Sequence, residues 1–235
     1  MTKRLNMINN ITSSTALVPY GDLQGSTVGM KISSYTRSNT RLNVNQKSVF
    51  LGTLLGDAHL SLNKRSINAS WVHSQALKNI QYSCHLFMEL WNFCLSIPGI
   101  KISMSSGIKY PATVVFTRSY PFFTEFLNIF YVNKIKVIPI EYLLLHLYSK
   151  ALAYWIIDDG SKSTNGGIRL HTESYTWVEV YKLAGLFHYL FDIKCSVQKT
   201  NNSRPLLYIH KSSINKLRHL VVPHILPMFR YKIGC

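Results

Sequence analysis

Hydrophobic positions follow two spacings along this chain, every third or fourth residue in some segments and every second residue in others. The helical spacing predicts helices at about 76–95 and near 120–131. Alternation of apolar and polar residues predicts strands at 100–106 and 112–118, and a strand-like pair covers 59–75. The first part of the chain therefore predicts two strands, a helix, two strands and a helix.

The same order recurs after residue 160. The elements expected there are strands on either side of Asn165–Gly167, a helix from Thr176 to Phe191, strands at 193–199 and 205–210, and a helix at 212–222. Thr176 with Glu179 three positions later has the pattern of a capping box. A repeat this long predicts two α+β halves related by a pseudo-twofold axis, at 45–145 and 146–235, rather than a solenoid.

Each half opens with an apolar segment that ends in aspartate. These segments are FLGTLLGDA at 50–58 and LAYWIIDDG at 152–160. Only 10 of the 235 residues are acidic, so carboxylates that close two similar apolar segments predict one site built from two parts. Asp57 and Asp159 hold matching places, since Asp57 precedes Ala58 as Asp159 precedes Gly160.

Both segments are expected to be short helices, capped by Asn45 and Ser149. Gly52 and Gly56 lie four residues apart on one face of the first helix. A face without side chains lets another backbone approach closely, so the two helices are predicted to pack together and bring their carboxylates side by side.

Residues 1–44 are rich in Ser, Thr and Asn, carry several basic residues and show no clear apolar period. This composition is that of a mitochondrial transit segment or of a basic leader, and we expect the region to be partly disordered. A chain made inside a mitochondrion would need no import signal, and the expected location is mitochondrial.

The chain is strongly basic, with 26 Lys and Arg residues, a net charge of +16 and a pI of about 9.8. Such a surplus indicates a polyanionic partner, with nucleic acid ahead of an anionic membrane. The basic residues lie among strand-like segments rather than on one amphipathic helix, which favours nucleic acid.

Two other kinds of site are not indicated. The four cysteines show neither CxxC spacing nor zinc-finger partners, so reduced structural thiols are expected. The most membrane-like stretch, 137–157, is interrupted by Pro139, Glu141, His146 and Lys150, so no membrane span is predicted.

The two acidic segments resemble the motif of LAGLIDADG homing endonucleases, in the compact single-chain type with two motifs that organellar introns encode. The resemblance covers roughly 45–235. The segments depart from the family motif at Phe50, Thr53, Leu55, Tyr154 and Trp155. The large aromatic residues at 154 and 155 imply an asymmetric contact between the two helices.

The resemblance implies a fold of two αββαββα halves with antiparallel, saddle-shaped sheets and the two motif helices packed at their interface. It also implies a divalent metal site for phosphodiester hydrolysis, with Asp57 and Asp159 as carboxylate ligands and the carbonyls of Gly56 and Asp158 as further ligands. Mg²⁺ suits oxygen ligands of this kind. Mn²⁺ is an alternative, and Ca²⁺ is expected to support DNA binding without cleavage.

Lys136 and Lys232 hold matching places late in each half. By resemblance, they approach the active site and polarise solvent or stabilise developing charge. The alternative is that each is a phosphate anchor or an ordinary exposed lysine.

DNA recognition is expected on the sheets, because a two-stranded ribbon fits the major groove. Val114, Phe116, Val197, Leu207 and Ile209 are predicted to face the core, and their neighbours, Val115 among them, to face away. The residues predicted to contact DNA are Lys64, Arg65, Trp71, His73, Lys101, Ser103, Thr113, Thr117, Lys162, Arg169, His171, Lys194, Ser196, Gln198, Tyr208 and His210, with Lys199, Asn201 and Arg204 at phosphates.

The function expected from these features is that of a sequence-specific, Mg²⁺-dependent double-strand DNA endonuclease that cuts a long asymmetric site as a monomer and promotes intron mobility. The alternative is an intron RNA maturase that assists splicing with little or no nuclease activity. A transcription-factor-like DNA binder would leave the paired acids unexplained.

Overall fold

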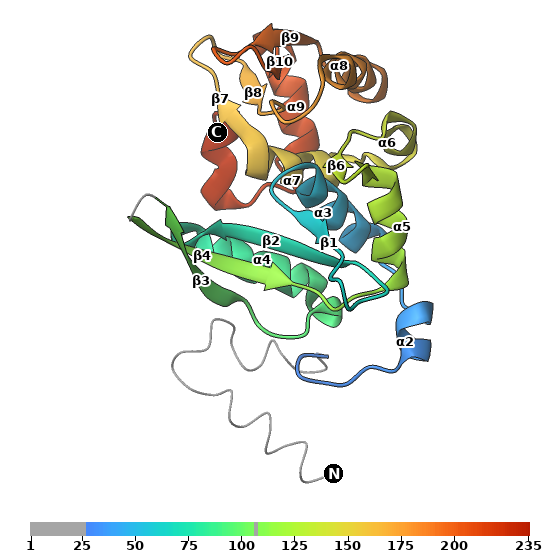
Figure 1. The fold of residues 1–235 in the computed structure, drawn as a ribbon. Helices are drawn as coiled ribbons and strands as arrows, with labels where there is room; N and C mark the ends of the chain where they lie inside the picture. Colours follow the sequence, from blue (N-terminus) through green and yellow to red (C-terminus); the bar gives the residue numbers. More distant parts are fainter. Residues whose placement is uncertain (1–26, 106–107) are drawn as a thin grey trace. The chain divides into compact units, whose positions relative to one another are not determined.

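The computed structural model describes residues 27–105 and 108–235, and they form an α+β fold with antiparallel sheets (Figure 1). Of the predicted leader, residues 1–26 lie outside this description, while Ser34–Asn39 form the short helix α2. No helix in the described ranges has both the length and the apolar character needed to cross a membrane.

By packing, the chain divides into two compact units. One comprises Met1–Thr40 and His59–Phe123, and the other comprises Arg41–Ala58 and Thr124–Cys235. The predicted halves follow the repeat of the sequence, whereas these units place the first motif helix with the second one because those two helices pack on each other. The arrangement of the halves about a pseudo-twofold axis stays a prediction.

The first unit is built on a four-stranded antiparallel sheet in the order β1-β2-β4-β3. Its strands are β1 (His59–Ser61), β2 (Ser70–Ala76), β3 (Gly99–Ser105) and β4 (Ile108–Phe116). Helix α4 (Ile80–Leu90), between the 3-10 turns η2 (Leu77–Asn79) and η3 (Trp91–Phe93), packs on β2 and β4. The predicted order of strands and helix is confirmed here.

The second unit contains an equivalent sheet in the order β7-β8-β10-β9. Its strands are β7 (Gly160–Lys162), β8 (Ile168–Leu170), β9 (Cys195–Lys199) and β10 (Pro205–Ile209). The matching strand order of the two sheets bears out the repeat seen in the sequence.

Helices and short elements complete the second unit. They are α3 (Val44–Leu55), the hairpin β5 (Tyr131–Val132) and β6 (Ile135–Lys136), α6 (Ile140–His146), α7 (Ser149–Asp159), α8 (Trp177–Phe191), η4 (Lys211–Ser213), α9 (Ile214–Val221) and η5 (Pro227–Ile233). Helix α5 (Pro121–Phe130) begins in the first unit and ends in the second. Thr176 caps α8, and its reciprocal bonds with Glu179 confirm the predicted capping box.

The motif helices begin slightly differently from the prediction. Asn43, not Asn45, caps α3 and forms a capping box with Gln46. Ser149 is the first residue of α7 rather than its cap, and the preceding Tyr148 makes no side-chain cap bond. A cap must have extended backbone geometry, and a polar residue one or two positions inside the helix gives the same sequence signal.

Helices α3 and α7 lie side by side and are buried almost all round, as expected of central helices (Figure 1). A Cβ atom at Gly52 would lie 2.7 Å from Cβ of Tyr154, and one at Gly56 would lie 2.7 Å from Oδ2 of Asp158. The missing side chains of both glycines therefore make room for the facing helix. The packing of Tyr154 against Gly52 also shows the predicted asymmetry.

Candidate active site and nucleic-acid-binding surface

Two acids that are far apart in sequence meet where the motif helices end. Helix α3 ends at Leu55 with Gly56 as its C-cap, and Asp57 follows. The backbone N–H of Asp57 donates a hydrogen bond of 3.2 Å to Oδ2 of Asp158. Carboxylate oxygens of Asp57 and Asp158 lie within 4.8 Å of each other. This contact brings together carboxylates from the two sequence motifs.

The sequence assigned only the backbone carbonyl of Asp158 to this site. In the structure the Asp158 side chain also takes part, because it lies against Gly56 and fills the space that a side chain there would occupy. The position of Asp158 on the α3-facing side of α7 is a consequence of helix packing, and the adjacent pair Asp158–Asp159 gives no local signal of it.

Asp159 lies in a more enclosed environment beside the other two acids. Its carboxylate accepts a hydrogen bond of 3.1 Å from Nε1 of Trp155. Burial raises the pKa of Asp159 to about 7, with a further rise from the negative charges of Asp158 and Asp57, although the Trp155 bond and Lys136 act in the opposite direction. Three carboxylates thus influence one another at this point, and a cation would relieve their repulsion.

The two predicted lysines both bind the ends of the motif helices. Nζ of Lys136, on β6, donates to the carbonyls of Gly56 and Ala58, each at 2.9 Å. Nζ of Lys232, on η5, donates to the carbonyl of Asp158 at 3.0 Å and also to that of Ile157. The last carbonyls of a helix have no partner within it, and positive charge is favourable there.

Both lysine residues are partly buried, so neither Lys136 nor Lys232 is an ordinary exposed lysine. Burial lowers the pKa of Lys136 to about 8, even though Asp159, Asp158 and Asp57 act to raise it. Burial also lowers the pKa of Lys232 against the same three acids. The carbonyl oxygens of Gly56 and Asp158 have a second lone pair each, so their predicted role as metal ligands is compatible with these bonds.

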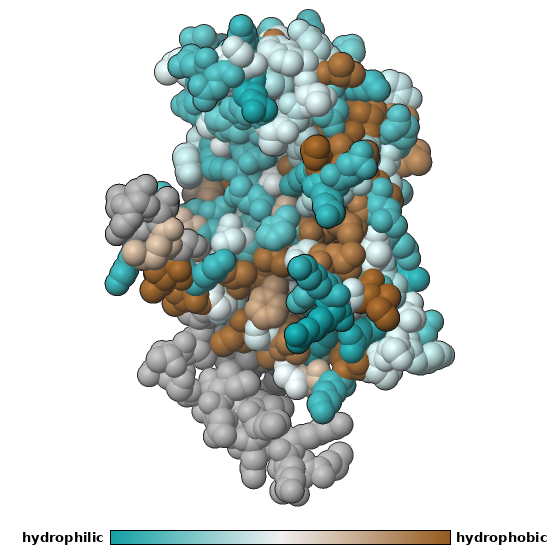
Figure 2. Space-filling model, viewed as in Figure 1, coloured by the Kyte–Doolittle hydropathy of each residue, from teal (hydrophilic) through white to brown (hydrophobic). Residues whose placement is uncertain are grey.

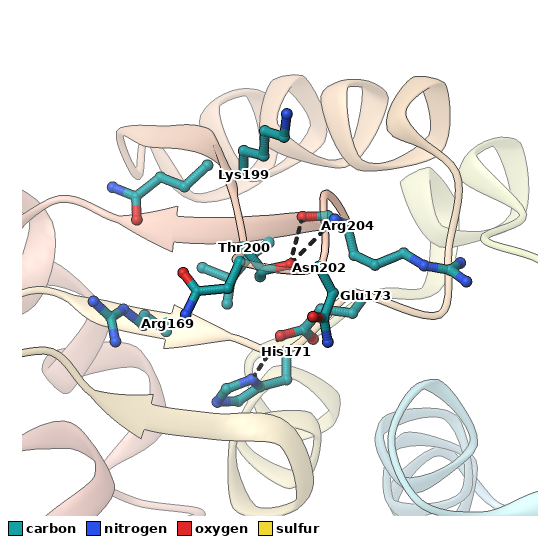
Figure 3. A pocket seen from close by; sticks show the side chains of 10 residues that line it. Arg169, His171, Glu173, Lys199, Thr200, Asn202 and Arg204 are labelled. Atoms are coloured by element: carbon teal, nitrogen blue, oxygen red, sulfur yellow. Dashed lines mark hydrogen bonds and ion pairs between the residues drawn. The ribbon is translucent and has the colours of Figure 1, made fainter.

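The open face of the second sheet brings several predicted DNA contacts together (Figure 3). A polar cavity of about 390 Å³ is lined by Arg169, His171, Gln198, Lys199, Asn201 and Arg204, all of them predicted from the sequence. The predicted alternation is seen on β8 and just after it, where Ile168 and Leu170 are buried while Arg169 and His171 are exposed. Leu207 and Ile209 are buried as predicted, but so is every other residue of β10, and Val197 on β9 is half-buried.

This cavity also contains residues that the sequence did not single out. Nδ1 of His171 shares a hydrogen bond of 3.1 Å with the carboxylate of Glu173, which lines the cavity (Figure 3). Nε2 of His171 shares another, of 2.9 Å, with Oγ of Ser161. Thr200 holds the turn between β9 and β10 through its bonds to the backbone of Arg204. No sequence pattern marks these positions, because the cross-strand neighbours of a short strand are set by register.

Five other predicted contacts of the second half differ in exposure. Lys162 and Lys194 are exposed, and Ser196 and His210 are half-buried. Tyr208 is buried, with its ring against Gly167, and we correct its assignment from a DNA contact to a packing residue. Pairing of Tyr208 with both Arg169 and Ser196 shows that its strand face was predicted correctly.

In the first sheet the predicted face was wrong. Trp71, His73, Thr113 and Thr117 are buried, and so is Val115, on the side of β2 and β4 that α4 covers. The hydroxyl of Thr113 hydrogen-bonds that of Ser83 on α4, and Oγ1 of Thr117 accepts from the backbone N–H of Trp71. Polar side chains that bond internally can occupy a core face, so polarity alone did not identify the exposed side.

The open face of the first sheet instead carries Val72, Ser74, Val114 and Phe116, which pair across β2 and β4. Lys101 pairs with Ala112 on the same side and is exposed, as are Lys64 and Arg65 in the connection from β1 to β2. The role of these three residues as DNA contacts stays a prediction. The side chain of Ser103 lies outside the described part of the structure.

The β3–β4 hairpin carries an exposed apolar side next to this cationic one. Ile100, Ile102 and Met104 are more than half exposed, and brown surface is visible beside the hairpin tip in Figure 2. Their alternation with Lys101 places them on the face that α4 covers further along the sheet. The hairpin therefore extends beyond its helix, and the same face also carries the exposed Lys109, which pairs with Met104.

Comparison with known proteins gives one family and several relatives. A model of the LAGLIDADG DNA endonuclease family matches residues 47–217. Cytochrome b mRNA maturase bI2 of Saccharomyces cerevisiae is 32% identical over 205 residues, which are 82% of this chain and 48% of that protein. Probable intron-encoded endonuclease 1 of Wickerhamomyces canadensis is 27% identical over 209 residues, 86% of this chain and 89% of that protein.

The solved structures include a similar protein bound to nucleic acid. The homing endonuclease I-WcaI bound to its DNA recognition sequence superposes with a TM-score of 0.76 and 25% identity, over 83% of this chain and 88% of that one. The chain thus matches I-WcaI over most of both lengths, but spans only about half of the yeast maturase.

Proposed function

Because the chain belongs to the LAGLIDADG DNA endonuclease family, we propose that it cuts both strands of DNA at a long, asymmetric site and so promotes intron mobility. The observation that carries this proposal is the meeting of the Asp57 and Asp158 carboxylates at the ends of two packed helices. A protein that only binds nucleic acid gains nothing from negative charges gathered at one point.

The residues at this point fit a divalent cation. Asp57, Asp158 and Asp159 offer oxygen ligands. Burial raises the pKa of Asp159, and the negative charges of Asp158 and Asp57 raise it further, a repulsion that a cation would offset. We propose Mg²⁺ or Mn²⁺ as the ion, with Ca²⁺ supporting binding alone. A bound ion would neutralise the attacked phosphate and make a nearby water more acidic.

The chain's own groups orient this site. Lys136 and Lys232 hold the carbonyls at the ends of α3 and α7, and so fix the backbone from which Asp57 and Asp158 project. Their ammonium groups remain close to the carboxylates, where we propose that they stabilise the charge that develops on the phosphate. Asp57 is exposed, so DNA could reach it without opening the core.

The second sheet would read bases in the major groove through Arg169, His171 and Gln198, while Lys199, Asn201 and Arg204 in and beside the β9–β10 turn contact phosphates. On the first sheet we propose Lys64, Arg65 and Lys101, joined by Ser74 from the open face. A single chain with two unlike faces would read a site that is not palindromic.

The test is cleavage of DNA that spans the exon junction of the host gene. Wild-type protein should cut both strands in Mg²⁺ and only bind in Ca²⁺. Asp57→Asn should reduce the single-turnover rate by at least about 100-fold, the scale seen when a group that stabilises a transition state is removed. Binding should persist, because the change removes negative charge near phosphate.

Asp192→Asn is a matched control, since Asp192 is exposed on the end of α8 and pairs with Lys216. It should cut at the wild-type rate. Cleavage by Asp57→Asn at an undiminished rate, or absence of cutting by the wild type at any exon junction, would refute the nuclease proposal.

One comparison favours a second function. The relative with 32% identity is named as a cytochrome b mRNA maturase, so we keep RNA maturation as the alternative, alone or beside cleavage. Binding of DNA without cuts, together with faster splicing of the intron RNA, would establish it. Relatives named for cytochrome b introns and for intron-encoded endonucleases also support a mitochondrial location.

A further inference from the structure

A second cationic pocket lies in the first unit, apart from the residues assigned above. It has a volume of about 500 Å³ and is lined by Met30, Lys31, Ile32, Arg37, Leu95, Thr117, Arg118 and Ser119. Three of these residues are basic, and none of the described residues that line the pocket is acidic. A cluster of positive charges without a carboxylate is unfavourable unless an anion accompanies it.

Arg118 fixes the wall of this pocket. Its side chain is 8% exposed, and its guanidinium donates to the carbonyls of Thr27, Met30 and Cys94 and to the hydroxyl of Thr27. All four of these acceptor atoms are neutral, so the buried guanidinium keeps its positive charge uncompensated by them. Burial lowers the pKa of Arg118, and the nearby positive charge of Arg37 acts in the same direction.

The segment from Thr27 to Asn39 is therefore held in a defined place. Besides the Arg118 bonds, the backbone N–H of Gly29 donates to the carbonyl of Leu95 at 2.9 Å. The hydroxyl of Thr27 donates to the backbone carbonyl of Asn92 at 2.8 Å. The segment continues into α2 at the edge of the first unit (Figure 1). It contributes Lys31 and Arg37 to the lining of the pocket. Nε and one terminal nitrogen of Arg37 donate to the carbonyl of Ile32.

We propose that this pocket binds the phosphate backbone of the DNA duplex, with Lys31 and Arg37 contacting phosphate and Arg118 holding the pocket in shape. The inference rests on the proposed DNA-binding function and adds to it a contact outside the strands. The pocket lies just after the end of β4, and the ends of a ribbon placed in the major groove meet the phosphates that border it. Phosphate contacts of this kind position a protein without reading sequence.

The test compares the salt dependence of DNA affinity in Ca²⁺ for wild type and for the double variant Lys31→Gln, Arg37→Gln. Each phosphate contact contributes roughly 0.9 to the slope of log affinity against log salt. We expect the double variant to lower that slope by about 1 to 2 on cognate and random duplexes alike. Lys182→Gln, Lys216→Gln, on α8 and α9, removes the same net charge and should leave the slope unchanged.

The single variant Lys31→Gln separates the loss of charge from unfolding of the segment. The Lys31 side chain is exposed, whereas Arg37 also donates a hydrogen bond to the carbonyl of Ile32. This variant should lower the slope by about 1. An unchanged slope in both variants would overturn the pocket proposal while leaving the nuclease proposal intact. A loss of affinity for intron RNA with an unchanged DNA slope would assign the pocket to RNA and also overturn it. If the wild type and both variants fail to bind any duplex, the pocket proposal and the proposed function both fail.

Discussion

At the scale of single residues, the candidate active site contains three carboxylates that repel one another. Asp57 is exposed, Asp158 bonds the backbone of Asp57, and Asp159 is enclosed beside Trp155. Burial and two like charges hold the pKa of Asp159 at about 7. Proteins place acids in this way where a cation or a proton transfer needs them.

The contribution of Asp159 to the stability of the metal-free protein should therefore be lost as pH rises from about 4 to about 7. The folded state holds the Asp159 proton more tightly than the unfolded chain, so stability from this group is complete below its unfolded pKa and is lost as pH rises through the folded value. Asp159→Asn should flatten this loss and be more stable than wild type at pH 7.5. Urea unfolding in EDTA across this range measures it.

In the same experiment, the contribution of Asp192 to stability should change with pH in the opposite direction. The hydrogen bond and charge of Lys216 lower the pKa of Asp192, so its contribution is lost as pH falls. Removal of that carboxylate should not stabilise the protein at pH 7.5. A lower stability of Asp159→Asn than of wild type at pH 7.5 would contradict the environment described for Asp159.

Lys232→Met should slow cleavage at saturating DNA by about 100-fold, because it removes positive charge beside Asp158 and the reacting phosphate. Single-turnover kinetics in Mg²⁺ measures this. Lys216→Met is the control, since Lys216 is exposed and pairs with Asp192 on the surface. An unchanged rate in Lys232→Met would leave Lys232 with only its structural role at the end of α7.

At the scale of elements, the site exists because α3 and α7 approach closely. Gly52 and Gly56 permit this approach, and Tyr154 and Asp158 occupy the space that they leave. The sequence predicted this contact from the glycine spacing alone. It did not predict which side of the first sheet is open, because β2 and β4 carry apolar and polar residues on both faces and internal hydrogen bonds hide Thr113 and Thr117.

Gly52→Ala should destabilise the protein by about 1–3 kcal/mol, the usual cost of extra atoms in a tightly packed core. The new Cβ would lie 2.7 Å from Cβ of Tyr154 and closer still to the carbonyl of Ala151. Gly185→Ala is the matched control, because nothing lies within 4 Å of that position on the exposed side of α8.

Gly185→Ala should stabilise by up to about 1 kcal/mol through helix propensity. Thermal and urea unfolding of the two variants compare them directly. Equal effects of both substitutions would mean that the α3–α7 contact is not close at Gly52.

At the scale of the whole molecule, one chain contains two sheets with the same strand order and different open faces. The second carries Arg169 on β8 and His171 just after it, whereas Val72, Ser74 and Val114 occupy the open face of β2 and β4 in the first. Two unlike faces in one chain favour a DNA site whose halves differ. A symmetric dimer would instead favour a palindrome.

We expect one chain to bind each duplex, and palindromes made from either half of the target to be cut at least about 10-fold more slowly. Each mismatched base pair costs about 1–3 kcal/mol, and a duplicated half-site introduces several. Mass photometry of the Ca²⁺ complex gives the stoichiometry, and cleavage of the two palindromes gives the rates. Two chains on the natural site, or equal rates on a palindrome, would contradict the proposal of a monomer.

Sequence by itself determined the elements, the repeat, the family and the acid Asp57 at the end of a glycine-faced helix, and the family match over residues 47–217 confirms that resemblance. The elements and the repeat follow from periodicity and composition, and the family follows from the resemblance of two short motifs, so each depends on neighbouring residues. Tertiary structure alone decided that the Asp158 carboxylate lies beside Asp57, which face of the first sheet is open, and that Arg118 holds the segment that carries Lys31. Each of these depends on a partner far along the chain, and packing and register select that partner rather than any local pattern.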